Sequence, residues 1–140
     1  MEVGDRRPNA LAGCGAGAAA CYDPRMLVKR YDEVAPTTYD GGRSGVTMRE
    51  MITAADGAPT FAMRVFDLAA GSSTPYHHHA WEHEVFIVRG TGRVKSEQGD
   101  RLFAAGDTVF IPGDEPHCFV ADTPVQFVCV IPAPNMCQTG

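Results

Sequence analysis

From residue 26 onward, short runs of Val, Ile, Phe, Thr and Met alternate with Gly, Pro and Asp, a pattern typical of all-β domains. About ten short strands are predicted, which in so small a domain implies two packed sheets or a closed barrel. The predicted strands are Met26–Tyr31, Gly45–Ile52, Phe61–Leu68, Pro75–His79, His83–Arg89, Gly92–Ser96, Arg101–Phe103, Thr108–Ile111, His117–Ala121 and Val125–Ile131.

Turn signals separate some of these runs, whereas helix signals are weak. Gln98-Gly99-Asp100 and Pro112-Gly113-Asp114 each predict a tight turn between two strands. Only Asp32–Ala35 or the Arg49–Ala55 region is a candidate helix, and neither has a sustained period of 3.6 residues. We therefore expect an all-β fold.

Size and composition narrow the class of protein. The 140 residues provide room for one domain, and 44% hydrophobic with 21% charged residues is typical of soluble globular proteins. The formal net charge is −5 and no basic run is present, so we expect no nucleic-acid partner. The longest apolar stretches are shorter than the ~18 residues of a membrane helix, so we expect no membrane partner.

Both ends of the chain are expected to be tails around one domain. Residues 1–24 form a Gly/Ala-rich tail, residues 25–134 the domain and residues 135–140 a C-terminal tail. Leu11–Cys14 has the pattern of a lipoprotein cleavage site, but no continuous apolar segment precedes it unless the start codon is wrongly assigned. The five cysteines are odd in number and form no CxxC pair, so reduced thiols and a cytoplasmic location are expected.

The histidines are concentrated where the chemistry is expected. All five lie in two segments, Tyr76–Glu84 and Pro116–Cys118. Residues two apart on a strand point to the same face, so His77 and His79 share a face, and His83 has the same parity. His78 points to the other face and is expected to be a solvated or interface residue. Three imidazoles on one face are half of a metal-binding shell.

Two motifs resemble a known family. Gly71–His79, followed by His83-Glu84 and Gly90, resembles the first cupin motif: a glycine, five residues, His-x-His, a third ligand and a closing glycine. Gly106–Pro112, followed by Asp114–His117, resembles the second cupin motif: a glycine, five residues, a proline and a histidine a few positions later. The two motifs occur in the order that the family has.

The resemblance covers roughly residues 26–132 and implies a double-stranded β-helix, a small cupin jelly-roll barrel with a metal inside. The third ligand is open: a three-residue gap gives His83, and a four-residue gap gives the family's usual glutamate at Glu84. Parity favours His83, and the string Trp81–Phe86 looks like the four-histidine branch of small single-domain cupins. The resemblance thus implies the metal ligands His77, His79, His83 and His117, with Glu84 as the alternative.

The sequence departs from the second motif at two positions. Asp114 stands where the family usually has a glycine, with Gly113 one place earlier, and Ala121 stands in place of the terminal asparagine. Neither position is a ligand, so the metal hypothesis is unaffected.

Parity also suggests the walls of the pocket. If the odd positions face inward, as the small four-histidine cupins imply, Phe119, Phe127 and Cys129 line the metal pocket. Arg49, Arg64 and Arg89 each interrupt an apolar strand. One of them is a candidate to meet a carboxylate-bearing substrate, although such arginines more often lie on the wet face or in a dimer contact.

Four neutral imidazoles suit one divalent ion such as Fe, Mn, Zn or Ni, and leave it two open positions. The first hypothesis is a metal-dependent enzyme of dioxygenase or oxidoreductase type that acts on a small organic substrate. A Lewis-acid isomerase or lyase ranks second, because no carboxylate base is evident: Glu84 faces away by parity and Glu82 precedes the strand. A non-catalytic cupin that binds or senses a small molecule is the alternative.

Oligomeric state is the last expectation. The strand His83–Arg89 is apolar on both faces, with Val85 and Ile87 on one and Phe86 and Val88 on the other. A strand buried on both sides of a small barrel suggests a partner, so a homodimer is expected.

Overall fold

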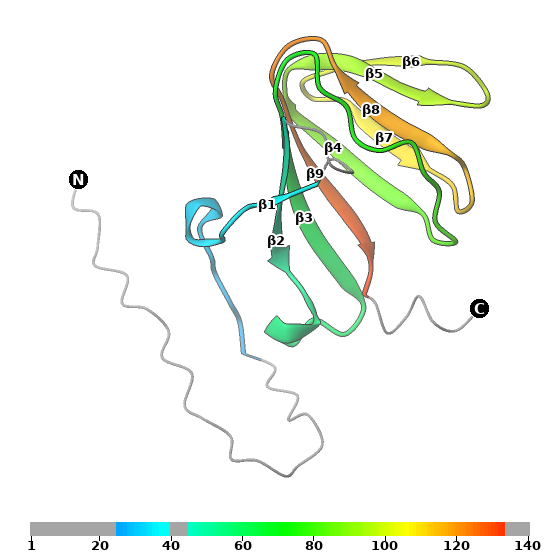
Figure 1. The fold of residues 1–140 in the computed structure, drawn as a ribbon. Helices are drawn as coiled ribbons and strands as arrows, with labels where there is room; N and C mark the ends of the chain where they lie inside the picture. Colours follow the sequence, from blue (N-terminus) through cyan, green and yellow to red (C-terminus); the bar gives the residue numbers. More distant parts are fainter. Residues whose placement is uncertain (1–24, 40–44, 134–140) are drawn as a thin grey trace.

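The computed structural model describes residues 25–39 and 45–133, which form nine strands and two single-turn 3-10 helices (Figure 1). The strands are β1 (Thr37–Thr38), β2 (Val46–Ile52), β3 (Phe61–Leu68), β4 (His83–Arg89), β5 (Thr91–Ser96), β6 (Arg101–Ala104), β7 (Thr108–Ile111), β8 (His117–Ala121) and β9 (Val125–Pro132). The 3-10 helices are η1 (Tyr31–Glu33) and η2 (Ala54–Asp56).

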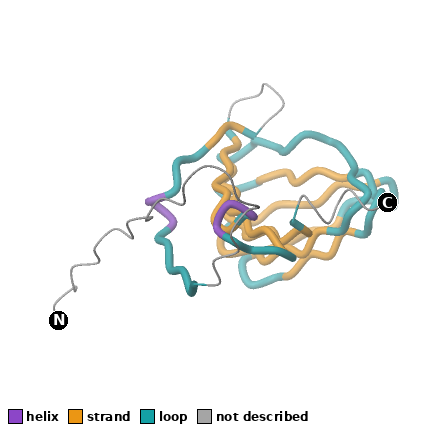
Figure 2. Tube along the Cα trace, turned by 90° about the horizontal axis from the view of Figure 1, so that it is seen from below, coloured by secondary structure: helices purple, strands orange, loops and turns teal. Residues whose placement is uncertain are grey.

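The strands form two antiparallel sheets. The larger sheet has the order β1-β2-β3-β9-β4-β7 and the smaller one the order β6-β5-β8 (Figure 1). The short helix η2 lies where the chain turns from β2 to β3, and η1 lies beside the larger sheet (Figures 1 and 2). This arrangement confirms the all-β double-stranded β-helix, and no helical segment among the described residues is long and apolar enough to span a membrane.

The core lies where the inner faces of the two sheets meet, because strand side chains alternate in direction. On β4, Val85 and Ile87 are buried, whereas Phe86 and Val88 are 48% and 44% exposed. The outer face of β4 therefore exposes two large apolar side chains in the single chain, and the homodimer remains a prediction. The buried cluster consists of Val46, Phe66, Leu68, Val85, Ile87, Val94, Phe103, Ile111, Phe119, Ala121, Val125, Phe127 and Cys129.

Two predicted strands are wrong. Residues 26–30 pair with no strand and lead into η1; Met26 is 92% exposed, so its apolar side chain has nothing to pack against. Residues 75–79 make only one isolated bridge, between His77 and His117. Pro75 lacks the N–H that a continuous ladder needs, and the segment instead crosses to β8 at single points.

The candidate helices are reduced to single turns. The helix expected near 32–35 is η1, and most of the region 49–55 is strand β2 followed by η2. At η2 the Thr53 side chain accepts from the N–H of Ala55, and the Asp56 carboxylate accepts from the N–H of Thr53. Gly57 ends the turn at a φ of 91°.

Gly92 is expected to be essential for the pairing of β5 with its neighbours. A Cβ at this position would lie 2.1 Å from the carbonyl oxygen of Val120 and 2.8 Å from the Phe103 ring. Gly92→Ala should therefore lower the free energy of unfolding by more than about 2 kcal/mol, measured by urea denaturation. Gly99→Ala is the matched control: its φ is +103° but nothing lies within 4 Å, so strain of about 1 kcal/mol is expected. Equal losses in the two variants would contradict the steric explanation.

Candidate metal centre

Four histidines converge from three parts of the chain. His83 is the first residue of β4 and His117 the first of β8, and both are buried. His77 and His79 lie in the segment between β3 and β4. The His77 N–H donates to the His117 carbonyl at 3.1 Å and the His117 N–H to the His77 carbonyl at 3.0 Å. This reciprocal backbone pair fixes the first motif against the second.

The four imidazole rings form a closed cycle. Ring centroids are 4.5 Å apart for His77 and His79, and 5.4 Å apart for His79 and His83. They are 5.0 Å apart for His83 and His117, and 5.2 Å apart for His117 and His77. Each ring therefore has two imidazole neighbours. We call this set the histidine cluster.

Backbone contacts orient two of these rings. Nδ1 of His77 lies 2.7 Å from the carbonyl oxygen of Pro75, and Nδ1 of His117 lies 2.8 Å from that of Glu115. A carbonyl oxygen only accepts, so in each ring Nδ1 carries the proton and Nε2 keeps its lone pair. This second interaction is the one that metal-binding histidines usually make. The buried Nε2 of His83 has no hydrogen-bond partner in the described part of the chain.

The spacing of the rings fits one divalent ion. With a metal–nitrogen bond of about 2.1 Å, two imidazoles bound at roughly 90–110° place their centroids roughly 4.6–5.3 Å apart. The four neighbouring distances run from 4.5 to 5.4 Å. Within residues 25–39 and 45–133, no three His, Cys, Asp or Glu side chains already stand as a ready-made metal site. The rings therefore have to rotate to direct their nitrogens to a shared ion.

Burial lowers the pKa of three rings of the histidine cluster. Desolvation, followed by repulsion from His77 and His117, lowers the pKa of His79 to about 4. Desolvation, followed by repulsion from His117 and Arg64, lowers the pKa of His83 to about 3. Burial also lowers the pKa of His117. Neutral imidazole is the form that binds metal, so these three rings are in the protonation state that a metal ligand needs at neutral pH.

The second motif supports the first through its turn. The Asp114 N–H donates to the His79 carbonyl at 2.5 Å, and Asp114 has a φ of 64°. A Cβ on Gly113 would lie 2.4 Å from the carbonyl oxygen of Ala80, so only glycine fits there. Asp114 therefore takes the left-handed conformation at the position where the family usually has a glycine. Aspartate is one of the residues that tolerate this conformation.

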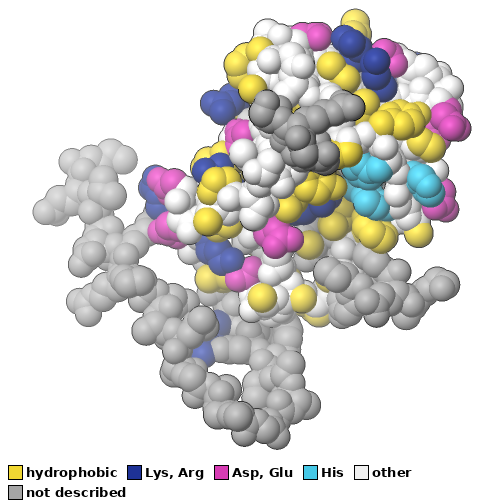
Figure 3. All heavy atoms as spheres, in the orientation of Figure 1, with side chains coloured by type: hydrophobic (Ala, Val, Ile, Leu, Met, Phe, Trp, Pro, Cys, Tyr) yellow, Lys and Arg dark blue, Asp and Glu magenta, His cyan; other side chains and the backbone are white. Residues whose placement is uncertain are grey.

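The remaining polar residues of the first motif point outward. Glu84 is exposed on the outer face of β4, opposite His83, and burial together with the Glu82 charge raises its pKa. His78 is also exposed, with Nδ1 3.9 Å from the Asp114 carboxylate. In Figure 3 histidine side chains reach the surface beside hydrophobic ones, so this segment is open to solvent.

The three expected pocket-lining residues are buried next to the cluster. Cys129 Sγ lies 3.4 Å from His83 Nδ1. The Phe119 ring lies edge-on to the His117 ring, with ring centroids 6.4 Å apart. The Phe127 ring stacks on the Phe119 ring with centroids 4.5 Å apart. Burial raises the pKa of Cys129, which keeps it a thiol.

Parity alone did not distinguish two further residues that adjoin the cluster. The Trp81 indole stacks on His79 with centroids 4.5 Å apart and planes 5° apart. Arg64 extends from β3, and its Nη2 lies 3.3 Å from Cys129 Sγ. In the sequence, Arg64 shares its parity with Ala62 and Phe66. Which face of the strand these residues occupy became clear only from the pairing of β3 with β9.

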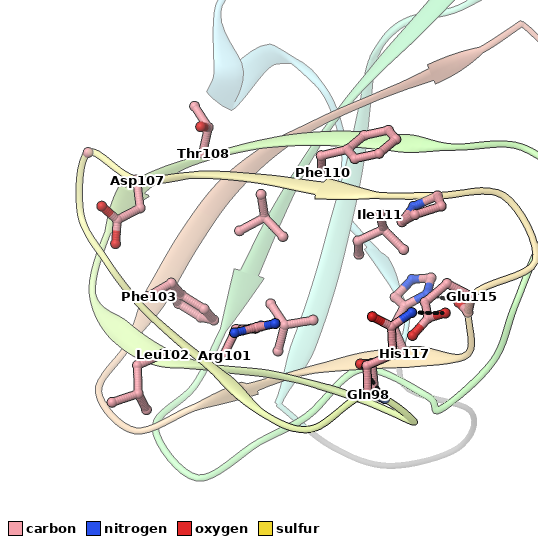
Figure 4. Close-up of a pocket in the computed structure, with 15 residues that line it drawn as sticks. Gln98, Arg101, Leu102, Phe103, Asp107, Thr108, Phe110, Ile111, Glu115 and His117 are labelled. Carbon is pink, nitrogen blue, oxygen red and sulfur yellow. Dashed lines mark hydrogen bonds between the residues drawn. The ribbon is translucent and has the colours of Figure 1, made fainter.

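A pocket of about 580 Å³ opens between β5, β6 and β7. It reaches the cluster only at His117, which lies with Gln98 and Glu115 at one end, while Leu102 and Asp107 lie at the other (Figure 4). The Gln98 amide donates to the Glu115 carboxylate at 3.4 Å. The pocket is therefore an approach to one edge of the cluster, and the expected lining residues Phe119, Phe127 and Cys129 do not line it.

Comparisons with known proteins agree with this fold. The family model of the cupin domain matches residues 64–131. The solved structure of the polyketide cyclase RemF from Streptomyces resistomycificus is 31% identical, with a TM-score of 0.71, and the match covers 77% of this chain and 80% of that one. A cupin-2 domain protein from Rhodospirillum rubrum is 25% identical, with a TM-score of 0.66 and coverage of 80% and 78%.

A curated protein is more distantly similar. L-ectoine synthase of Mycobacteroides abscessus is 23% identical over 111 residues, which are 78% of this chain and 85% of that protein. The paired motifs, the two-sheet barrel and these matches all indicate the same protein family. The chain belongs to the cupin domain family.

Proposed function

We propose that this protein is a divalent-metal-dependent cupin enzyme of the four-histidine kind, and that it acts on a small organic substrate by Lewis-acid chemistry. Ring closure of a substrate with several carbonyl groups is the reaction class that we favour. The closed cycle of four imidazole rings is the observation that carries the proposal. The similarity to a polyketide cyclase at 31% identity supports the reaction class.

The residues that would hold the ion are His77, His79, His83 and His117. Four neutral ligands leave the charge of the ion uncompensated, so when bound it would polarise a carbonyl or enolate oxygen of the substrate. Zn, Fe, Mn and Ni all accept imidazole nitrogen, so the ligand types do not select among them.

The surrounding side chains have separate roles. The carbonyls of Pro75 and Glu115 hold two imidazoles in the tautomer with a free Nε2. The face of Trp81 fixes the plane of the His79 ring. Phe119, stacked on Phe127, provides an apolar wall that excludes water beside His117. Exclusion of water strengthens the electrostatic interactions inside the barrel.

The test begins with elemental analysis of untagged protein, purified without chelator or nickel resin. Near-stoichiometric divalent metal is expected. Chelator-treated protein should lose the ability to convert linear polycarbonyl compounds into ring-closed products, and should regain it on reloading with metal. Chromatography measures the formation of the ring-closed products. An oxygen electrode follows the same reactions. Oxygen consumption coupled to substrate loss would replace Lewis-acid chemistry by the dioxygenase type, and failure to take up any metal would overturn the proposal.

A further inference from the structure

Arg64 introduces a positive charge into an otherwise apolar inner face. Alternate residues of β3 point into the barrel, and Ala62, Phe66 and Leu68 in this row are 5%, 3% and 2% exposed. Arg64 has the same parity and is partly buried among them. Its guanidinium carbon lies 5.1 Å from the centroid of the Phe66 ring.

The hydrogen bonds of this guanidinium are weak. Nη2 contacts Cys129 Sγ at 3.3 Å and Nη1 contacts Met48 Sδ at 4.0 Å, and both sulfur atoms are poor acceptors. Nε is buried and has no hydrogen-bond partner among the residues that the structure describes. Other arginines of the larger sheet are paired: Arg49 and Arg89 lie 3.4 and 3.3 Å from the Asp67 carboxylate. In the described part of the chain, no carboxylate forms an ion pair with Arg64.

A partly buried guanidinium without a counter-charge favours the binding of an anion. Removing a guanidinium from water without a counter-charge costs free energy, and an unsatisfied buried N–H adds to that cost. The planar fork of arginine matches a carboxylate, which accepts two parallel hydrogen bonds from it. A carboxylate bound here would replace the sulfur contacts with charge-assisted hydrogen bonds.

The position of Arg64 connects this anion to the histidine cluster. Cys129 Sγ lies 3.3 Å from Arg64 Nη2 and 3.4 Å from His83 Nδ1, so one sulfur atom separates the guanidinium from an imidazole. We propose that Arg64 binds a carboxylate of the substrate beside the histidine cluster, and that the substrate is therefore a small organic carboxylate. This inference rests on the proposed function, and it makes Arg64 a specificity-determining residue.

Trp81 provides a direct readout, because it is the single tryptophan of the chain and stacks on His79. Malonate is the probe, and malonamide is its neutral counterpart. Each is titrated into zinc-loaded and into metal-free protein while Trp81 fluorescence is followed. We expect malonate to bind both forms, and malonamide to bind much more weakly.

Variants then assign the binding to one side chain. Arg64→Met should weaken malonate binding at least about tenfold in both forms, because charge-assisted hydrogen bonds are lost, and should leave zinc content unchanged. Arg64→Lys keeps the charge without the fork and should give an intermediate Kd, which a merely structural role would not produce. Arg101→Met is the matched control, since Arg101 is exposed and lines the 580 Å³ pocket.

The outcomes separate this inference from the proposed function. Unchanged malonate affinity in Arg64→Met overturns the inference, and loss of affinity in Arg101→Met instead places the anion in the 580 Å³ pocket and also overturns it. If Arg64→Met does not fold, Arg64→Lys decides: wild-type affinity overturns the inference and a weaker one supports it. A wild-type protein that takes up no divalent metal overturns the proposed function, while malonate binding to metal-free protein still tests Arg64.

Discussion

His83→Ala and His117→Ala should each remove most bound divalent metal while the barrel remains folded. Each ring is one of four in a closed cycle, so its loss leaves three ligands around the ion. Replacing a group that only orients a ligand already costs 10–100-fold in metal affinity, so loss of a ligand should cost more than about hundredfold. The fold survives because the buried cluster of apolar residues extends well beyond the two imidazoles.

Zinc content after equilibrium dialysis measures this effect, and circular dichroism checks the fold. His78→Ala and Glu84→Ala are matched controls, since both side chains belong to the same segment and are exposed. Both should keep wild-type zinc content. An empty site in Glu84→Ala together with a full site in His83→Ala would contradict the assignment and make Glu84 the third ligand.

Local periodicity explains why much of the histidine cluster was predictable from the sequence. Strand parity led us to expect His77, His79 and His83 on one face, and His78 and Glu84 on the other. The alternation holds on β4 for His83 and Glu84, whereas His77 and His79 lie in a segment with a single isolated bridge. Eight of the ten predicted strands have the observed bounds to within one residue, such as Phe61–Leu68 and His83–Arg89. These are runs whose inner residues are buried, so pattern and packing agree.

Features that depend on distant pairing were not predictable. Residues 26–30 carry a strand-like pattern but find no neighbouring strand, and residues 75–79 meet β8 only at isolated points. Arg49, Arg64 and Arg89 were equivalent in the sequence. Only the pairing of β3 with β9, which sets Arg64 opposite Cys129, distinguishes the inward arginine from the two that pair with Asp67.

Acid should destabilise the metal-free protein well before carboxylates are protonated. The unfolded chain binds protons at histidine near pH 6.5, whereas folded His79 and His83 bind them only near pH 4 and 3. Between these values the unfolded state holds more protons, so the free energy of unfolding falls as pH falls. The stability from the neutral rings is complete above pH 6.5 and decreases through this window.

Urea denaturation in chelator at about pH 7 and about pH 5.5 measures the effect, because most carboxylates titrate near pH 4. Each unit of pKa difference corresponds to about 1.4 kcal/mol between the two protonation states, so the loss over this interval should be on the order of 1 kcal/mol for each of the two histidines. His83→Leu removes the most strongly shifted group and should flatten the dependence, whereas His78→Ala, an exposed histidine of the same segment, should not. Equal stability of the wild type at both pH values would mean that these imidazoles accept protons in the folded state near pH 6.5, as surface histidines do. The histidine cluster would then lose metal near that pH.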